Sequence, residues 1–194
     1  GEPGAEIMYP NPGFPIYESV INYSGAKAVP IPLLEENDFS FDAEEVLSLI
    51  TPATRLMIIN TPANPTGGAV PRAEMDKLAA GLEAHPHVAI LSDEIYGQMT
   101  YDGLEHVSLL EYEHLRDRLI LLDACSKTYY MTRWRLGYAL WPASLVDMAT
   151  RLAINSHSCV NAATPIAGIA ALEGPPSPFP EMVRALDTRS DVRF

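Results

Sequence analysis

The chain has 194 residues, and its 13 Lys and Arg against 25 Asp and Glu give a formal net charge of −12 at pH 7. Hydrophobic residues make up 47% and charged residues 20%, which excludes a disordered chain and predicts one globular domain or little more. The acidic balance leaves no basic stripe for nucleic acid. No apolar run is long enough to span a membrane, and the two cysteines, Cys125 and Cys159, fit a reducing cytoplasm.

Six short apolar segments bounded by turn residues are predicted to be β-strands. They cover residues 7–9, 28–31, 56–60, 88–92, 119–123 and 137–140. Four of them are rich in Val, Ile and Leu without polar alternation, which is typical of strands that are buried on both faces. Segments with helical periodicity lie between most of them. The sequence therefore predicts an α/β fold with a mostly parallel sheet and helices on both faces.

Five helices are predicted between and after these strands. They cover residues 15–23, 42–50, 71–83, 143–157 and 164–172. Asp42 is suited to cap the second helix, with Glu44 and Glu45 beside its positive end. A proline-rich stretch follows Glu173 and breaks regular structure. We therefore expect one domain over residues 1–174, and a linker with the start of a further helix over residues 175–194.

Polar side chains follow three of the predicted strands. Asn64 lies after the strand 56–60, Asp93 and Tyr96 after 88–92, and Ser126 and Lys127 after 119–123. In an open parallel sheet, ligands bind beyond the carboxyl ends of the strands. We therefore expect these residues to meet at one edge of the sheet.

Each candidate residue also has a structural interpretation when it is taken alone. Asn64 and the Pro-Thr-Gly that follows it make a good turn. Asp93 is suited to cap the segment after it, and Lys127 has the residue type of a surface side chain. Trp134 and Arg135 are compatible with a core aromatic beside a solvated neighbour. The order and spacing of all of them together favour a functional interpretation.

Together, these motifs resemble the class I and II aminotransferases of the aspartate aminotransferase superfamily. Four segments carry the resemblance, namely Asn-Pro-Gly-Phe-Pro-Ile-Tyr at 11–17, Asn-Pro-Thr-Gly at 64–67, Ser-Asp-Glu-Ile-Tyr at 92–96, and Ser-Lys-Thr at 126–128 with Trp-Arg-Leu-Gly-Tyr at 134–138. The resemblance covers the chain from about Tyr9 to Glu173. It implies a fold type I enzyme that uses pyridoxal 5'-phosphate (PLP) to transfer an amino group between an amino acid and a 2-oxo acid.

The resemblance also implies the roles of the catalytic residues. Lys127 would form the Schiff base with the cofactor aldehyde and later carry the proton between substrate and cofactor. Asp93 would hold the proton on the pyridine nitrogen. Tyr96 and Asn64 would donate hydrogen bonds to the phenolic oxygen of the cofactor.

Three further residues are assigned to the cofactor in the same way. Arg135 corresponds to the arginine that binds the phosphate, Ser126 offers a hydroxyl group, and Phe14 matches the aromatic that stacks on the ring. A core aromatic is the alternative for Phe14. Two positions depart from the family pattern, because Ala124 stands where a phosphate-binding Ser is frequent and Arg133 stands where Gly is usual.

Family members also have an N-terminal phosphate loop and a C-terminal small domain with an arginine for the substrate carboxylate, and we find neither in this sequence. We therefore expect an incomplete large domain that is inactive alone, and a cytoplasmic homodimer for the full-length protein. A PLP-dependent lyase of the carbon–sulfur type and a non-catalytic fragment of the fold stay open as alternatives. No metal site is expected, since the pair His85 and His87 lacks partners in the sequence.

Overall fold

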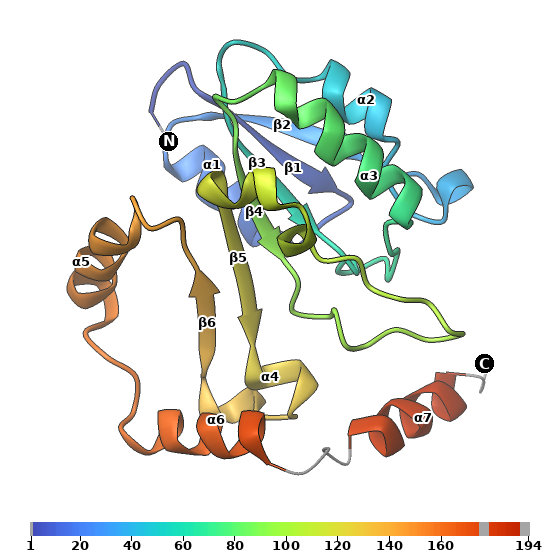
Figure 1. Ribbon diagram of the computed structural model, residues 1–194, viewed down its shortest axis with the longest axis vertical. Helices are drawn as coiled ribbons and strands as arrows, with labels where there is room; N and C mark the ends of the chain where they lie inside the picture. Colours follow the sequence, from blue (N-terminus) through green and yellow to red (C-terminus); the bar gives the residue numbers. More distant parts are fainter. Residues whose placement is uncertain (1, 175–178, 191–194) are drawn as a thin grey trace.

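The computed structural model describes residues 2–174 and 179–190 and is built around one six-stranded sheet (Figure 1). The strands are β1 (Glu6–Asn11), β2 (Lys27–Pro32), β3 (Thr54–Asn60), β4 (Ala89–Asp93), β5 (Leu119–Ala124) and β6 (Gly137–Leu140). Their order in the sheet is β2-β1-β3-β4-β5-β6. The first five strands are parallel, and β6 is antiparallel to β5. All six predicted strands and the mostly parallel sheet are confirmed.

Helices surround this sheet. They are α1 (Ile16–Tyr23), α2 (Ala43–Ser48), α3 (Arg72–Gly81), α4 (Cys125–Thr128), α5 (Val146–His157), α6 (Ala163–Glu173) and α7 (Phe179–Ser190). Short 3-10 turns are η1 (Glu35–Asn37), η2 (Leu82–Ala84), η3 (Leu109–Glu111), η4 (Glu113–Arg118) and η5 (Thr132–Trp134). The five predicted helices are confirmed, whereas α4 and the 3-10 turns were not predicted. The expected linker falls mainly on residues 175–178, which lie outside the described part of the chain.

The two faces of the sheet are covered by different helices, because successive side chains of a strand point to opposite faces. In β1, Ile7 and Tyr9 pack with α1 in a small apolar cluster. Met8, which lies between them, joins the larger core formed with α2 and α3. The prediction of helices on both faces is therefore confirmed, and the continuous apolar strands are explained by burial from two sides.

The β6 side of the sheet is covered less completely. Figure 1 shows α5 and α6 beside β6, at the end of the sheet farthest from β2. α5 has no buried residue. Exposed apolar side chains on these two helices are Val146, Met148, Leu152, Ile154, Ile166, Ile169 and Leu172. Within the described ranges, no helix has both the length and the apolar character needed to cross a membrane.

Candidate active site

A cavity of about 180 Å³ lies where β3, β4 and β5 end. It is lined by Phe14, Tyr17, Asn60, Asn64, Asp93, Ile95, Tyr96 and Lys127. Asn60 and Asp93 are the last residues of β3 and β4 and are paired in register. The structure thus brings together five of the seven predicted site residues, which come from four separate segments of the chain.

Asp93 is held in place by two hydrogen bonds. The hydroxyl of Tyr17 donates to Oδ2 at 2.6 Å, and the backbone N–H of Ile95 donates to Oδ1 at 3.3 Å. Burial raises the pKa of Asp93 above its usual value, and the two hydrogen bonds offset only part of this rise. Burial also raises the pKa of Tyr17, and the negative charge of Asp93 raises it further. The phenol therefore stays protonated and can donate its hydrogen bond. The carboxylate is therefore fixed in orientation.

Asn60 links the end of β4 to the turn that carries Asn64. Its Nδ2 donates to the backbone oxygen of Asp93 at 3.0 Å, and its Oδ1 accepts from the backbone N–H of Asn64 at 3.0 Å. The turn is closed by the N–H of Gly67, which donates to the Ala63 oxygen at 2.8 Å. Gly67 has a φ of +77°, a conformation that glycine adopts without steric cost. The Asn-Pro-Thr-Gly segment is therefore a turn that also lines the cavity through Asn64.

Sequence analysis did not identify Tyr17 or Asn60 as site residues. Tyr17 lies in the first turn of α1, and Phe14 lies just before that helix, where its backbone oxygen accepts from the Tyr17 N–H at 3.1 Å. The early motif therefore brings the two rings together. Asn60 is a polar residue at the end of an otherwise apolar strand, and it is buried with 5% exposure. The signal available in the sequence was a polar residue inside an apolar strand predicted to be buried, since buried polar groups are hydrogen-bonded.

Lys127 extends from α4, directly after β5, into the cavity. Its Nζ lies 5.2 Å from the centroid of the Tyr96 ring. Phe14 is 43% exposed and meets Tyr17 edge-on with ring centroids 5.8 Å apart, so it is not a core aromatic. The cavity therefore combines an amine, a fixed carboxylate, a phenol and an amide beside an open aromatic face.

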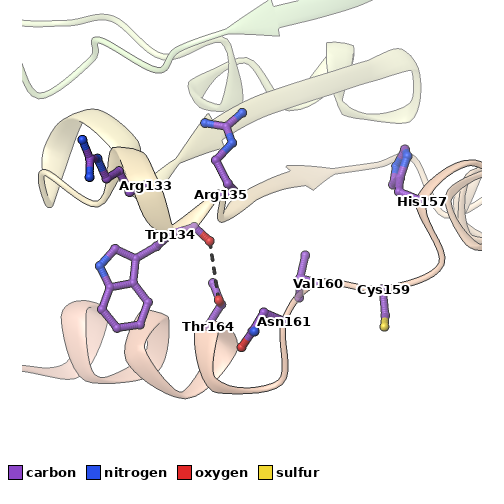
Figure 2. Close-up of a pocket in the computed structure, with 8 residues that line it drawn as sticks. All are labelled: Arg133, Trp134, Arg135, His157, Cys159, Val160, Asn161 and Thr164. Atoms are coloured by element: carbon purple, nitrogen blue, oxygen red, sulfur yellow. Dashed lines mark hydrogen bonds between the residues drawn. The ribbon is translucent and has the colours of Figure 1, made fainter.

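Arg135 and Ser126 do not line this cavity. Arg135 lines a second pocket of about 740 Å³ together with Arg133, Trp134, His157, Cys159, Val160, Asn161 and Thr164 (Figure 2). Its guanidinium donates to the Thr132 oxygen at 3.2 Å. Ser126 accepts a hydrogen bond from Thr132 Oγ1 at its backbone oxygen, at 3.1 Å. The structure thus separates the two predicted phosphate contacts from the other five residues.

The second pocket is built where η5 meets the start of α6. Figure 2 shows the Trp134 ring directed toward α6, whereas Arg135 extends away from that helix. Thr164 Oγ1 donates to the backbone oxygen of Trp134 at 3.5 Å. Among the described carboxylates, none forms an ion pair with Arg133 or Arg135. Nor does the described part of the chain hold a group of three or more His, Cys, Asp or Glu placed for a metal ion.

The family model and the curated relatives that match this chain point to the same protein family. The model of the family described as aminotransferase class I and II matches residues 1–192. Arginine–pyruvate transaminase AruH of Pseudomonas aeruginosa is 38% identical, over 98% of this chain and 48% of its own length. An aspartate aminotransferase of Geobacillus stearothermophilus is 35% identical, over 98% of this chain and 49% of its own length. The chain spans about half the length of these curated relatives.

Solved structures agree with this result. The aspartate aminotransferase of Rhizobium meliloti has a TM-score of 0.94 at 32% identity, over 99% of this chain and 48% of that one. The aromatic aminotransferase of Pyrococcus horikoshii OT3 has a TM-score of 0.93 at 29% identity, over 98% of this chain and 52% of that one. The fold is therefore that of the aspartate aminotransferase-like, PLP-dependent transferases. By its motifs, its fold and its match to the family model, the chain belongs to the class I and II aminotransferases.

Proposed function

We propose that the protein transfers an amino group between an amino acid and a 2-oxo acid with PLP as cofactor. The observation that carries this proposal is the cavity in which Lys127, Asp93, Tyr96 and Asn64 meet. The relatives reported above are named for arginine and pyruvate or for aspartate, and amino transfer is what they share. The proposal is therefore made for the reaction class.

The residues of the cavity fit this cofactor. Asp93 is a carboxylate fixed by two hydrogen bonds. A carboxylate in this position is suited to accept a charge-assisted hydrogen bond from a protonated pyridine nitrogen. Tyr96 and Asn64 carry donors of the type that a phenolic oxygen accepts. Phe14 offers an exposed ring for stacking. For the phosphate in the full-length protein, we propose Arg135 and Ser126, which flank Lys127 in the sequence but do not line the cavity in this chain.

The chemistry of the reaction is divided between the cofactor and these side chains. When bound, PLP supplies an aldehyde that reacts with amines and an electron-poor ring that takes up an electron pair. Lys127 would hold the cofactor through Nζ, and as a free amine the same Nζ would carry a proton to and from the substrate α-carbon. Asp93 holds a proton on the ring nitrogen, while Tyr96 and Asn64 stabilise negative charge on the phenolic oxygen.

The alternatives from the sequence are less well supported. A carbon–sulfur lyase is not favoured, because the relatives and structures reported above are all named aminotransferases. A non-catalytic chain is not favoured either, since the cavity holds both the amine and the carboxylate that the reaction needs.

We also propose that residues 1–174 form the PLP-binding large domain, that residues 175–194 are a linker and the start of a further helix, and that the full-length protein is a homodimer. Exposed apolar side chains on α5 and α6 support an interface on that side of the sheet. A cytoplasmic location is supported by two free cysteines, Cys125 and Cys159.

The test is to reduce the protein with borohydride in the presence of PLP and to map the labelled peptide. The sequence has three lysines, at positions 27, 77 and 127. Lys27 pairs with Glu6 at 2.8 Å and Lys77 with Glu74 at 2.7 Å, whereas Lys127 faces the cavity. We expect label on Lys127 and its loss in Lys127→Ala, with Lys77→Ala as the matched control. Label on Lys27 or Lys77 with Lys127 unmodified would overturn the proposal.

A further inference from the structure

A buried carboxylate lies beside the cavity without lining it. Glu94 is 8% exposed and follows Asp93 directly in the chain. Its Oε1 accepts hydrogen bonds from Ser92 Oγ at 2.8 Å and from the backbone N–H of Leu109 at 3.1 Å. Its Oε2 lies 2.8 Å from His106 Nε2, which must be the donor because an ionised carboxylate only accepts. Glu94 is thus tied to β4, to η3 and to the loop that carries His106.

The backbone of Glu94 begins the turn on which Tyr96 lies. The N–H of Gly97 donates to the Glu94 oxygen at 2.7 Å, and the N–H of Met99 donates to the Tyr96 oxygen at 2.7 Å. A Cβ atom on Gly97 would lie 2.8 Å from His106 Cδ2 and 3.1 Å from the Glu94 oxygen. The imidazole of His106 therefore bonds to the Glu94 carboxylate at one end of the turn and leaves no room for a side chain at Gly97, the other end.

The hydrogen bonds to Glu94 decide its charge. Burial alone would raise the pKa of Glu94, but its hydrogen bonds hold the pKa below its usual value. The bond from His106 lowers the pKa more than the other bonds do. Glu94 is therefore ionised at neutral pH inside the protein. If the His106 donor is removed, the buried Glu94 carboxylate loses one hydrogen-bond partner. This loss destabilises the folded state unless the turn 94–97 moves so that water can reach Glu94.

We propose that His106 is a positioning residue for Tyr96, because it fixes, through Glu94 and Gly97, the turn that presents Tyr96 to the cavity beside Lys127. The inference rests on the proposed function, in which Tyr96 donates a hydrogen bond to the cofactor. His106 does not line the cavity with Lys127. His106 therefore affects the position of the Tyr96 hydroxyl and takes no direct part in the reaction.

The first measurement needs no cofactor. In His106→Leu, which loses the donor, hydrogen exchange at the amides of Gly97 and Met99 should become about tenfold faster or more. In His106→Gln, whose amide N–H replaces Nε2, exchange should stay within about threefold of wild type, since one charged hydrogen bond is kept. His114→Leu is the matched control, because it removes a histidine hydrogen bond to the Ala79 oxygen elsewhere.

The second measurement is the dissociation constant for PLP, read from the cofactor absorbance. It should rise about tenfold in His106→Leu and stay near the wild-type value in His106→Gln and His114→Leu. If His106→Leu does not fold, His106→Asn takes its place, since this polar side chain is too short to reach Glu94 Oε2.

Two results would overturn the positioning role. One is unchanged exchange at Gly97 and Met99 when the donor is removed, whatever the affinity for PLP. The other is faster exchange with a PLP affinity no lower than that of His114→Leu. A wild-type protein that binds PLP at another lysine overturns the proposed function instead, and the exchange data distinguish that failure from failure of the positioning role.

Discussion

Asp93 is the residue at which burial and hydrogen bonding act in opposite directions. Its pKa lies above the ordinary value of 3.8, first because of burial, while Tyr17 and Ile95 lower it in part. A carboxyl group with a raised pKa in the folded state adds stability that is fully present below its unfolded-state pKa. That contribution is lost as the pH rises through the folded-state pKa. The protein therefore keeps Asp93 in the cavity at a cost in stability near neutral pH.

We expect Asp93→Asn to remove this pH-dependent cost, because an amide has no charge to bury and its oxygen still accepts from Tyr17. The free energy of unfolding of the cofactor-free wild type should fall relative to the variant as the pH rises from below 3.8 to 7. Urea unfolding of both proteins at the two ends of this range is the measurement. Parallel stabilities over the whole range would contradict the assignment of a raised pKa.

The site was predictable where a residue and its neighbours in sequence carry the signal. Asp93 ends the apolar strand β4 and Lys127 lies in α4, which follows β5 directly, so the sheet brings them to one edge. Tyr17 donates its hydrogen bond to Asp93, which lies 76 positions away in the sequence, and no local pattern indicates such a contact. The direction of the Arg135 side chain depends on a backbone φ of +52°, which the residue type does not predict.

At the scale of elements, α2 is the helix whose start signal the sequence predicted and the structure confirms. The Asp42 side chain accepts from the backbone N–H of Glu45 at 2.9 Å. Because α2 has only six residues, a lost cap affects a large share of its hydrogen bonds. Asp42→Ala should lower the free energy of unfolding by about 1 kcal/mol.

Urea unfolding with a matched control checks this prediction. Glu36→Ala removes a carboxylate from the exposed turn η1, and we expect it to change the free energy of unfolding by less than about 0.5 kcal/mol. Equal effects of the two substitutions would mean that the Asp42 cap adds no stability beyond that of an exposed carboxylate.

Elements were predictable where their apolar residues repeat often enough to show a period. The six strands and the helices α1, α2, α3, α5 and α6 have such a repeat. The helix α4 has four residues and the turn η5 has three, so neither completes a period that a pattern could reveal. The antiparallel direction of β6 was likewise not predicted, because apolar patterning does not record strand direction. It follows from the connection of 125–136, which holds only α4 and η5 and no longer crossover helix.

At the scale of the whole molecule, two features limit what these 194 residues do by themselves. The predicted phosphate ligand Arg135 lines the 740 Å³ pocket and not the cavity that holds Lys127. Helices α5 and α6 expose apolar side chains on the β6 side, as is typical of a surface that packs against further protein. Both features lie outside the cavity and do not change the positions of Lys127 and Asp93 inside it.

We therefore expect the 194-residue chain alone to bind PLP through Lys127 but to gain little from its phosphate. A bidentate guanidinium contact is worth roughly ten- to a hundredfold in affinity, so without it PLP and pyridoxal should bind within about tenfold of each other. The same chain should not turn over an amino acid with a 2-oxo acid, since substrate orientation contributes much of the rate. Absorbance titrations with both cofactor forms and a two-substrate assay are the measurements. PLP binding far tighter than that of pyridoxal would show that Arg135 already reaches the cavity, and steady transamination by residues 1–194 would show that the chain alone orients the substrate.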